Sequence, residues 1–138
     1  MAYKETFADS LNMIPKALKW AESQDIKPLR DFFIEDAQKP LYCFASGGSY
    51  SSVDYAALLY EANQGMAKAL TPLSLSSVSD ETLKSSKILF TTSEGRGHDE
   101  KYVAKRATKA NPENTCAIVR NGGDDNDVVK KLRKAGSK

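Results

Sequence analysis

The sequence predicts an α/β fold, a three-layer α/β/α sandwich built on a parallel sheet. Short apolar runs typical of buried strands alternate with amphipathic helical patterns along the chain. Strands that are joined through helices in this way pair in parallel. Two turns rich in glycine and serine, 46–52 and 92–99, each follow an apolar run and precede a helical pattern. Such turns are typical of the ligand-binding edge of an open parallel sheet.

The 138 residues are expected to form one domain, with a helical segment, 1–39, packing on an α/β part, 40–138. Apolar residues at spacings of three and four predict an amphipathic helix over about 5–24. Pro15 lies inside this pattern, so we expect a kink or a break there. A shorter helix is expected over about 28–38. The apolar positions of the first helix are Phe7, Leu11, Ile14, Leu18 and Ala21.

The α/β part is expected to contain four strands, separated by helices. The expected strands are 41–45, 72–76, 88–92 and 115–119. The expected helices are 49–68, 99–110 and 125–135, with one capped turn at 79–83. Pro72 indicates that the second strand lies at a sheet edge or starts late, because proline cannot donate to a central ladder. The sequence leaves open whether the chain is an excised part of a longer protein.

Composition excludes several classes of function. A net charge of +2 gives no general attraction to nucleic acid. Apolar stretches are too short to span a bilayer, and the N-terminus has no signal-peptide pattern, so we expect a cytoplasmic protein without membrane contact. Cys43 and Cys116 lie in apolar runs and are expected to be buried free thiols. With one histidine and no CxxC motif, no metal site is expected.

The two turns offer the groups that bind a small anion. Each would present backbone N–H groups and hydroxyls at a helix N-terminus. Because both turns follow parallel strands, we expect them to form one site at the mouth of the sheet. The candidate binding residues are Ser46, Gly47, Gly48, Ser49, Ser51 and Ser52 in the first turn, and Thr92, Ser93, Glu94, Gly95, Arg96 and Gly97 in the second.

The first turn, with its Gly47-Gly48-Ser49 sequence, and the second, about 45 residues later, together resemble the SIS (sugar isomerase) phosphosugar-binding domain. The second turn reads Thr92-x-Glu94-Gly95-x-Gly97-x-Asp99, and the likeness covers about residues 40–130. The resemblance implies a parallel sheet of order 2-1-3-4-5, in which strands one and three flank a topological switch point. Only four strands are evident in this sequence, so the expected order is 2-1-3-4 with the fifth strand absent.

The resemblance also implies that hydroxyls and amides of both turns hold a phosphate. Ser49, Thr92, Gly95 and Asp99 match the family pattern. Two residues depart from it, because Glu94 stands where serine is usual and Gly97 where threonine is usual. These departures remove two hydroxyl donors and add a carboxylate.

As an SIS domain, the chain would bind a phosphosugar or related carbohydrate derivative without a cofactor, as a homodimer. A sugar-phosphate isomerase also needs an acid or base near the sugar, and Glu61 and His98 are the candidates. Alternatively, Glu61 faces solvent or pairs across a subunit interface, and His98 is a solvent-exposed residue at the start of a helix. Two further alternatives are a degenerate, non-catalytic SIS module for regulation or dimerisation, and a flavodoxin-like domain that binds FMN.

Overall fold

The computed structural model describes residues 7–92, 97–119 and 126–137. In these residues four strands form one sheet of order β2-β1-β3-β4, and every pairing is parallel. This confirms the predicted fold class and strand order. The strands are β1 (Leu41–Phe44), β2 (Ala67–Leu70), β3 (Lys87–Thr92) and β4 (Thr115–Val119).

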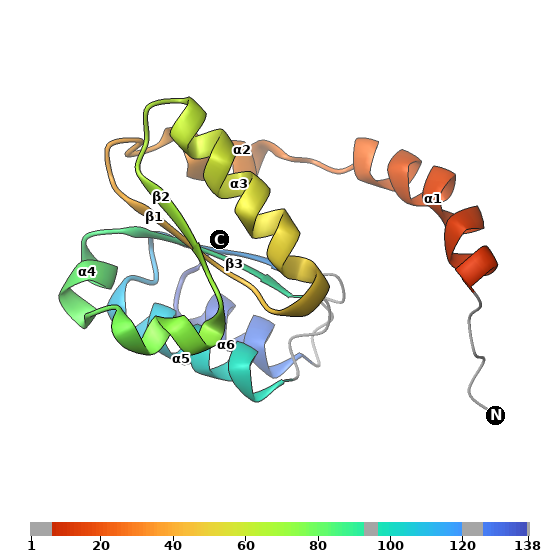
Figure 1. Cartoon of the computed structure of the whole chain (residues 1–138). Helices are drawn as coiled ribbons and strands as arrows, with labels where there is room; N and C mark the ends of the chain where they lie inside the picture. The colour runs from red at the N-terminus through yellow and green to blue at the C-terminus, as the bar shows by residue number, and fades with distance from the viewer. Residues whose placement is uncertain (1–6, 93–96, 120–125, 138) are drawn as a thin grey trace.

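Helices cover both faces of the sheet (Figure 1). The described helices are α1 (Phe7–Glu22), α2 (Lys27–Ile34), α3 (Tyr50–Ala62), α4 (Asp80–Lys84), α5 (His98–Ala110) and α6 (Asp127–Lys134), with 3-10 helices η1 (Gly47–Ser49) and η2 (Pro72–Ser77). On one face the core joins the sheet to α2 and α3, and on the other it joins the sheet to η2, α4, α5 and α6. The sheet is therefore the middle of three layers.

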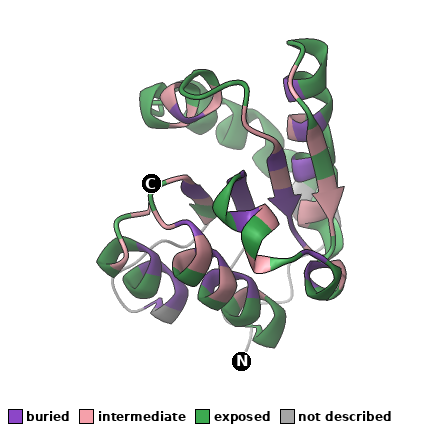
Figure 2. Cartoon of the chain, turned by 90° about the vertical axis from the view of Figure 1, so that its left-hand side faces the viewer, coloured by how far each residue is buried: buried purple, intermediate pink, exposed green. Residues whose placement is uncertain are grey.

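Successive residues of β3 supply the two cores in turn. Ile88 and Phe90 belong to the core beneath α5 and α6, whereas Leu89 belongs to the core beneath α3. This alternation follows from the two-residue period of a strand, and burial on both faces explains why the three successive residues 88–90 are all apolar. Buried residues accordingly gather on the strands and on the helix faces turned toward them (Figure 2). Cys43 and Cys116 are buried free thiols, as expected.

The boundary between α3 and β2 differs from the prediction. The helix expected to reach residue 68 ends at Ala62, and Gln64 adopts a left-handed φ of 68°. The second strand is 67–70 instead of 72–76, and the residues from Pro72 onward form η2. Pairing with β1 overrides the helical pattern here, because propensity is a weak constraint beside a buried neighbouring strand. The turn also requires Gly65, since a Cβ there would overlap the ring of Tyr60.

The segment 1–39 divides into two parts that behave differently. α2 packs on the sheet through the buried Phe32, and it is shorter than the expected 28–38. α1 instead stands away from the rest of the chain (Figure 1), with Leu11, Met13, Ile14, Leu18 and Trp20 exposed. Pro15 lies inside α1 without splitting it. α2 is therefore the part of this segment that joins the core of the sheet.

The remaining elements lie close to their predicted places. The short α4 is capped by the hydroxyl of Ser79, which accepts a hydrogen bond from the Thr82 amide. The side chain of Asn126 caps α6 by accepting from the amides of Val128 and Val129. Such caps satisfy amides that a helix start leaves without partners. Among the described residues, none of the helices has the length and apolar character of a membrane span.

Candidate functional site

The carboxyl ends of β1 and β3 lie next to each other at one edge of the sheet. Phe44, the last residue of β1, pairs with Phe90, and β3 continues for two residues to Thr92. The chain leaving β1 therefore begins its turn beside the end of β3. The connections from these two strands leave toward opposite faces, since α3 and α5 lie on different sides of the sheet. This is the topological switch point where open α/β sheets bind ligands.

The first turn has a backbone conformation that depends on glycine. Ser46 is extended, and Gly47 then adopts a φ of 56°, in the left-handed region. From Gly47 the chain turns directly through η1 into α3. A Cβ placed on Gly47 or Gly48 would meet no atom within 4 Å, so both glycines border open space. The turn thus presents backbone at the positive end of the α3 dipole with room for a solute.

The hydroxyls of the first turn are not all engaged. Ser51 Oγ donates to the carbonyl oxygen of Gly48 at 3.1 Å, which fixes the start of α3. Ser49 occupies the N-cap position of α3, but its side chain makes no capping hydrogen bond. Ser49 is half-buried, while Ser52 is exposed. The half-buried hydroxyl of Ser49 and the open backbone at Gly48 thus lie together at the start of α3.

Only the ends of the second turn are described. Ser93, Glu94, Gly95 and Arg96 lie outside the described residues. Thr92 is buried at the end of β3, and Gly97 is the N-cap residue of α5.

Glu100 lies at this edge of the sheet and was not among the predicted site residues. Thr92 Oγ1 donates to Glu100 Oε1 at 3.3 Å, and a Cβ on Gly97 would overlap the Glu100 carboxylate. Glycine at 97, where the family pattern has threonine, therefore makes room for this carboxylate. A glutamate three residues after an N-cap is the capping-box spacing, and that signal could have revealed its position.

The two predicted acid–base residues lie at different ends of the molecule. His98 is exposed in the first turn of α5, at the same edge as Thr92. Glu61 is exposed in the last turn of α3. At a rise of 1.5 Å per residue, Glu61 lies about 18 Å along the helix from Ser49. The fold brings His98 toward the turns and carries Glu61 of the same chain away from them.

Neither a family model nor a curated protein sequence matches this chain. Solved structures do match. A candidate sugar-phosphate isomerase from Listeria monocytogenes is 12% identical with a TM-score of 0.63, over 93% of this chain and 71% of that chain. A protein from Methanococcus jannaschii, whose structure was used to infer a 3-hexulose-6-phosphate isomerase function, is 24% identical with a TM-score of 0.63, over 89% of this chain and 68% of that chain.

A candidate sugar-binding protein from Salmonella typhimurium has a TM-score of 0.64 at 15% identity, over 94% of this chain but only 45% of that chain. The chain has the fold of these proteins. At such identities the likeness extends to the α/β architecture and strand order, which agree with the SIS-type sheet expected from the two turns.

Proposed function

We propose that the protein binds a phosphosugar or a related carbohydrate derivative at the edge where β1 and β3 end. The observation that carries the proposal is the first turn, in which left-handed Gly47 and the adjacent Gly48 open the N-terminus of α3 to a solute. Backbone N–H groups at a helix N-terminus are well suited to a phosphate. The sugar-phosphate functions assigned to structural neighbours favour this ligand over FMN or a silent module.

The site divides into an anion-binding part and a hydroxyl-binding part. The first turn supplies amides and the Ser49 hydroxyl for the phosphate. Glu100, which contacts Thr92, belongs to the hydroxyl-binding part. Its carboxylate can accept hydrogen bonds from sugar hydroxyls but would repel a phosphate. We therefore expect the ligand to bind with its phosphate toward α3 and its carbon chain toward α5.

Isomerase activity is a second step of the proposal. Moving a proton between adjacent sugar carbons requires a base within hydrogen-bond reach of the carbon chain. His98 and Glu100 both belong to α5. This is the side on which we expect the carbon chain of the sugar. Glu61 could serve this role only at a site on another copy of the chain, because of its position at the far end of α3.

The proposal is tested by thermal unfolding against a panel of aldose and ketose phosphates, the same sugars without phosphate, inorganic phosphate and FMN. We expect one sugar phosphate to stabilise the protein in a concentration-dependent way, by about 2.7 kcal/mol at a hundred times its Kd. Ser49→Ala should weaken its binding about 10-fold or more, the loss of one hydrogen bond to a charged group. Gly48→Ala should weaken it through contact with the new methyl group, without strain in the free protein.

Ser85→Ala is the matched control. Ser85 is an exposed serine that precedes β3 and so lies at the opposite edge of the sheet. This variant should bind the ligand as the unmodified protein does. Stabilisation by FMN alone would favour the flavodoxin alternative, and stabilisation by no compound would favour the non-catalytic module.

A further inference from the structure

α5 and α6 cover the same face of the sheet, and both are rich in basic residues. Each helix carries four lysines and arginines, whereas the two helices together carry three acidic residues, all of which lie in the first turns. In α2, by contrast, Lys27 and Arg30 both pair with Asp31 of the same helix. The surface of α5 and α6 beyond their first turns is therefore positively charged.

An open groove of about 470 Å³ lies between the later turns of the two helices. A smaller hollow of about 150 Å³ lies nearer their starts, and Lys131 borders both. Later residues of α5 thus lie beside later residues of α6, so the two helices run in the same direction. We call the surface of the larger groove the basic groove; it is made of Lys105, Thr108 and Lys109 of α5, Lys131 and Lys134 of α6, and the adjoining Ala135.

The cations of the basic groove have few anionic partners in the described part of the chain. No carboxylate there forms an ion pair with Lys105, Lys131 or Lys134. Lys109 lies 3.7 Å from Asp80, a carboxylate that Arg106 also contacts. The lysines on each helix are one turn apart, and like charges at that spacing destabilise a helix. An anion bound between the two rows would relieve this repulsion.

The floor of the basic groove is apolar. Thr108 Oγ1 donates to the carbonyl oxygens of Ala104 and Lys105, at 2.8 and 3.2 Å, so its hydroxyl is engaged by its own helix. The methyl group of Thr108 therefore remains for contact within the groove, and Ala135 borders it from the end of α6. Lysine side chains add apolar stems below their charged ends. The groove combines an apolar floor with cationic rims.

This combination favours an acidic peptide over a nucleic acid. Proteins that bind single-stranded nucleic acid stack its bases on aromatic side chains, and no aromatic residue lines the groove or the smaller hollow. Bidentate contacts with phosphate also require arginine, whereas the rims carry lysine. Carboxylates on either side of an apolar side chain would fit both the rims and the floor, which phosphates would leave unfilled.

We propose that the basic groove binds an acidic segment of a partner protein, in which carboxylates flank an apolar side chain. The lysines of both helices hold the carboxylates, and the apolar side chain lies against Thr108 and Ala135. The groove is distinct from the candidate ligand site. Lys109 is eleven residues after His98, which places it about 16 Å farther along α5 from the edge where β1 and β3 end.

Fluorescence anisotropy tests this proposal with a labelled peptide that has glutamates four residues apart around a leucine. We expect the peptide to bind, and to bind more weakly as salt is added, because exposed charges are screened. A peptide with glutamine in place of glutamate should bind about 10-fold more weakly or worse. Replacing the leucine by serine should also weaken binding, through loss of the apolar contact.

Charge reversal on the protein locates the binding surface. Lys105→Glu and Lys131→Glu should each weaken binding of the glutamate peptide about 10-fold or more. Lys19→Glu, at an exposed lysine of α1, makes the same change in net charge and should leave binding unchanged. Because all three lysines are exposed, the circular dichroism spectra should match that of the unmodified protein. A peptide with lysine in place of glutamate should bind the double variant Lys105→Glu/Lys131→Glu and not the unmodified protein.

Four results would overturn the proposal. They are no binding of the glutamate peptide, equal binding of the glutamate and glutamine peptides, an effect of Lys19→Glu as large as that of Lys131→Glu, and tighter binding of an oligouridine RNA through the same lysines. Stabilisation by sugar phosphates should be the same in the charge-reversal variants as in the unmodified protein, so the two proposals can fail separately.

Discussion

Arg106 shows how one side chain joins three segments on the α5 face of the sheet. Its Nη1 donates to the carbonyl oxygen of Leu75 at 2.7 Å, and its Nη2 donates to that of Val78 at 2.9 Å. Nη2 also donates to the carboxylate of Asp80, at the start of α4. The planar guanidinium suits such a multiple contact better than an ammonium group does. η2 and α4 are thereby fixed to α5.

The Asp80 contact makes stability depend on pH in a defined direction. Hydrogen bonding from Arg106 lowers the pKa of Asp80 below its ordinary value. A carboxyl whose folded-state pKa is lowered stabilises the fold above its unfolded pKa, about 3.9, and this contribution is lost as pH falls through the folded-state pKa. Asp80→Asn should therefore lower the urea midpoint at pH 7, and the difference from wild type should shrink by pH 3.

Urea unfolding at several pH values measures this difference. Glu113→Gln, at an exposed carboxylate between α5 and β4, is the matched control and should show a smaller effect at pH 7. A difference between Asp80→Asn and wild type that stays constant from pH 7 to pH 3 would contradict the electrostatic role of Asp80.

Glu100 is a residue of the candidate site that the sequence analysis did not predict. The glycine and serine turns could be predicted because each residue type has a local reason to be there: Gly47 for its positive φ and the serines for their hydroxyls. The Glu100 carboxylate occupies the space beside Gly97 and accepts a hydrogen bond from the Thr92 hydroxyl eight residues earlier. The spacing of Glu100 from the start of α5 could be read from the sequence, but its contact with Thr92 is set by the fold.

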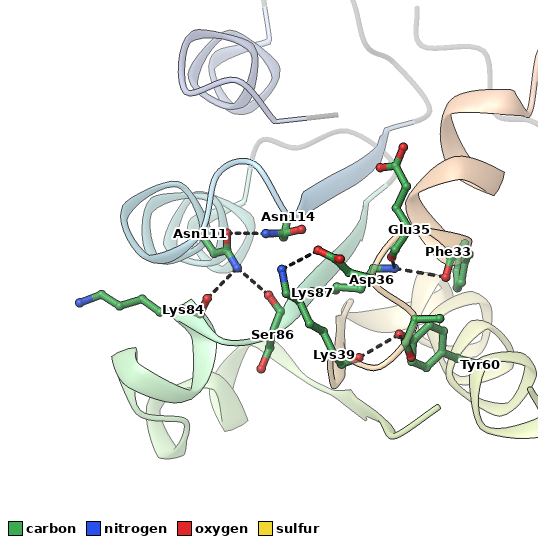
Figure 3. Close-up of polar contacts among 11 residues, drawn as sticks. Phe33, Glu35, Asp36, Lys39, Tyr60, Lys84, Ser86, Lys87, Asn111 and Asn114 are labelled. Carbon is green, nitrogen blue, oxygen red and sulfur yellow. Dashed lines mark hydrogen bonds and ion pairs between the residues drawn. The ribbon is translucent and has the colours of Figure 1, made fainter. Parts of the chain in front are cut away.

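At the scale of elements, a buried lysine ties α2 to the sheet. Lys87 begins β3 and is only 1% exposed. Its Nζ donates to the carbonyl oxygens of Phe33 and Glu35, at 3.2 and 2.6 Å (Figure 3). It also lies 4.8 Å from the centre of the Phe32 ring. A cation at the C-terminus of a helix satisfies carbonyls that the helix leaves open and complements its dipole.

Replacing this lysine should loosen α2 while leaving the sheet intact. Lys87→Met keeps most of the aliphatic volume but removes the donors to two carbonyl oxygens. We expect the free energy of unfolding to fall by about 2 to 3 kcal/mol. Urea denaturation followed by circular dichroism measures this loss. Lys84→Met, at an exposed lysine in the last turn of α4, should change stability by less than about 0.5 kcal/mol. Equal effects of the two substitutions would contradict the role of Lys87.

Helices and strands could be predicted where neighbouring residues alone determine them, and could not where distant pairing does. α4 could be located because Ser79 caps it with a neighbouring amide. β2 could not, because the run from Ala67 to Leu70 has no apolar pattern of its own and becomes a strand through its pairing with β1. α1 was found by periodicity, but periodicity identifies an apolar face without identifying what covers it.

At the scale of the whole molecule, the order of strands and helices could be predicted because the chain has two cores, one on each face of the sheet. Burial on both faces gives β1 and the centre of β3 their apolar residues, and the helices between the strands leave only parallel pairing. The neighbouring order of β1 and β3 came from the family resemblance and is confirmed by their register.

The two cysteines report on the integrity of this fold as a whole. Cys43 in β1 and Cys116 in β4 belong to the same core, beneath α3. Burial raises the pKa of Cys43 to about 12. Because the thiolate is the reactive form, a buried and protonated thiol does not react with a disulfide reagent until the core opens. We expect both thiols of the native protein to react with such a reagent at pH 8 at least about 10³-fold more slowly than in urea.

The urea concentration at which the thiols become reactive should coincide with the loss of circular dichroism, because exposing this core requires separating α3 from the sheet. Leu73→Cys supplies an exposed thiol as a control and should react at once in the native protein. Rapid reaction of Cys43 without denaturant would mean that α3 opens locally.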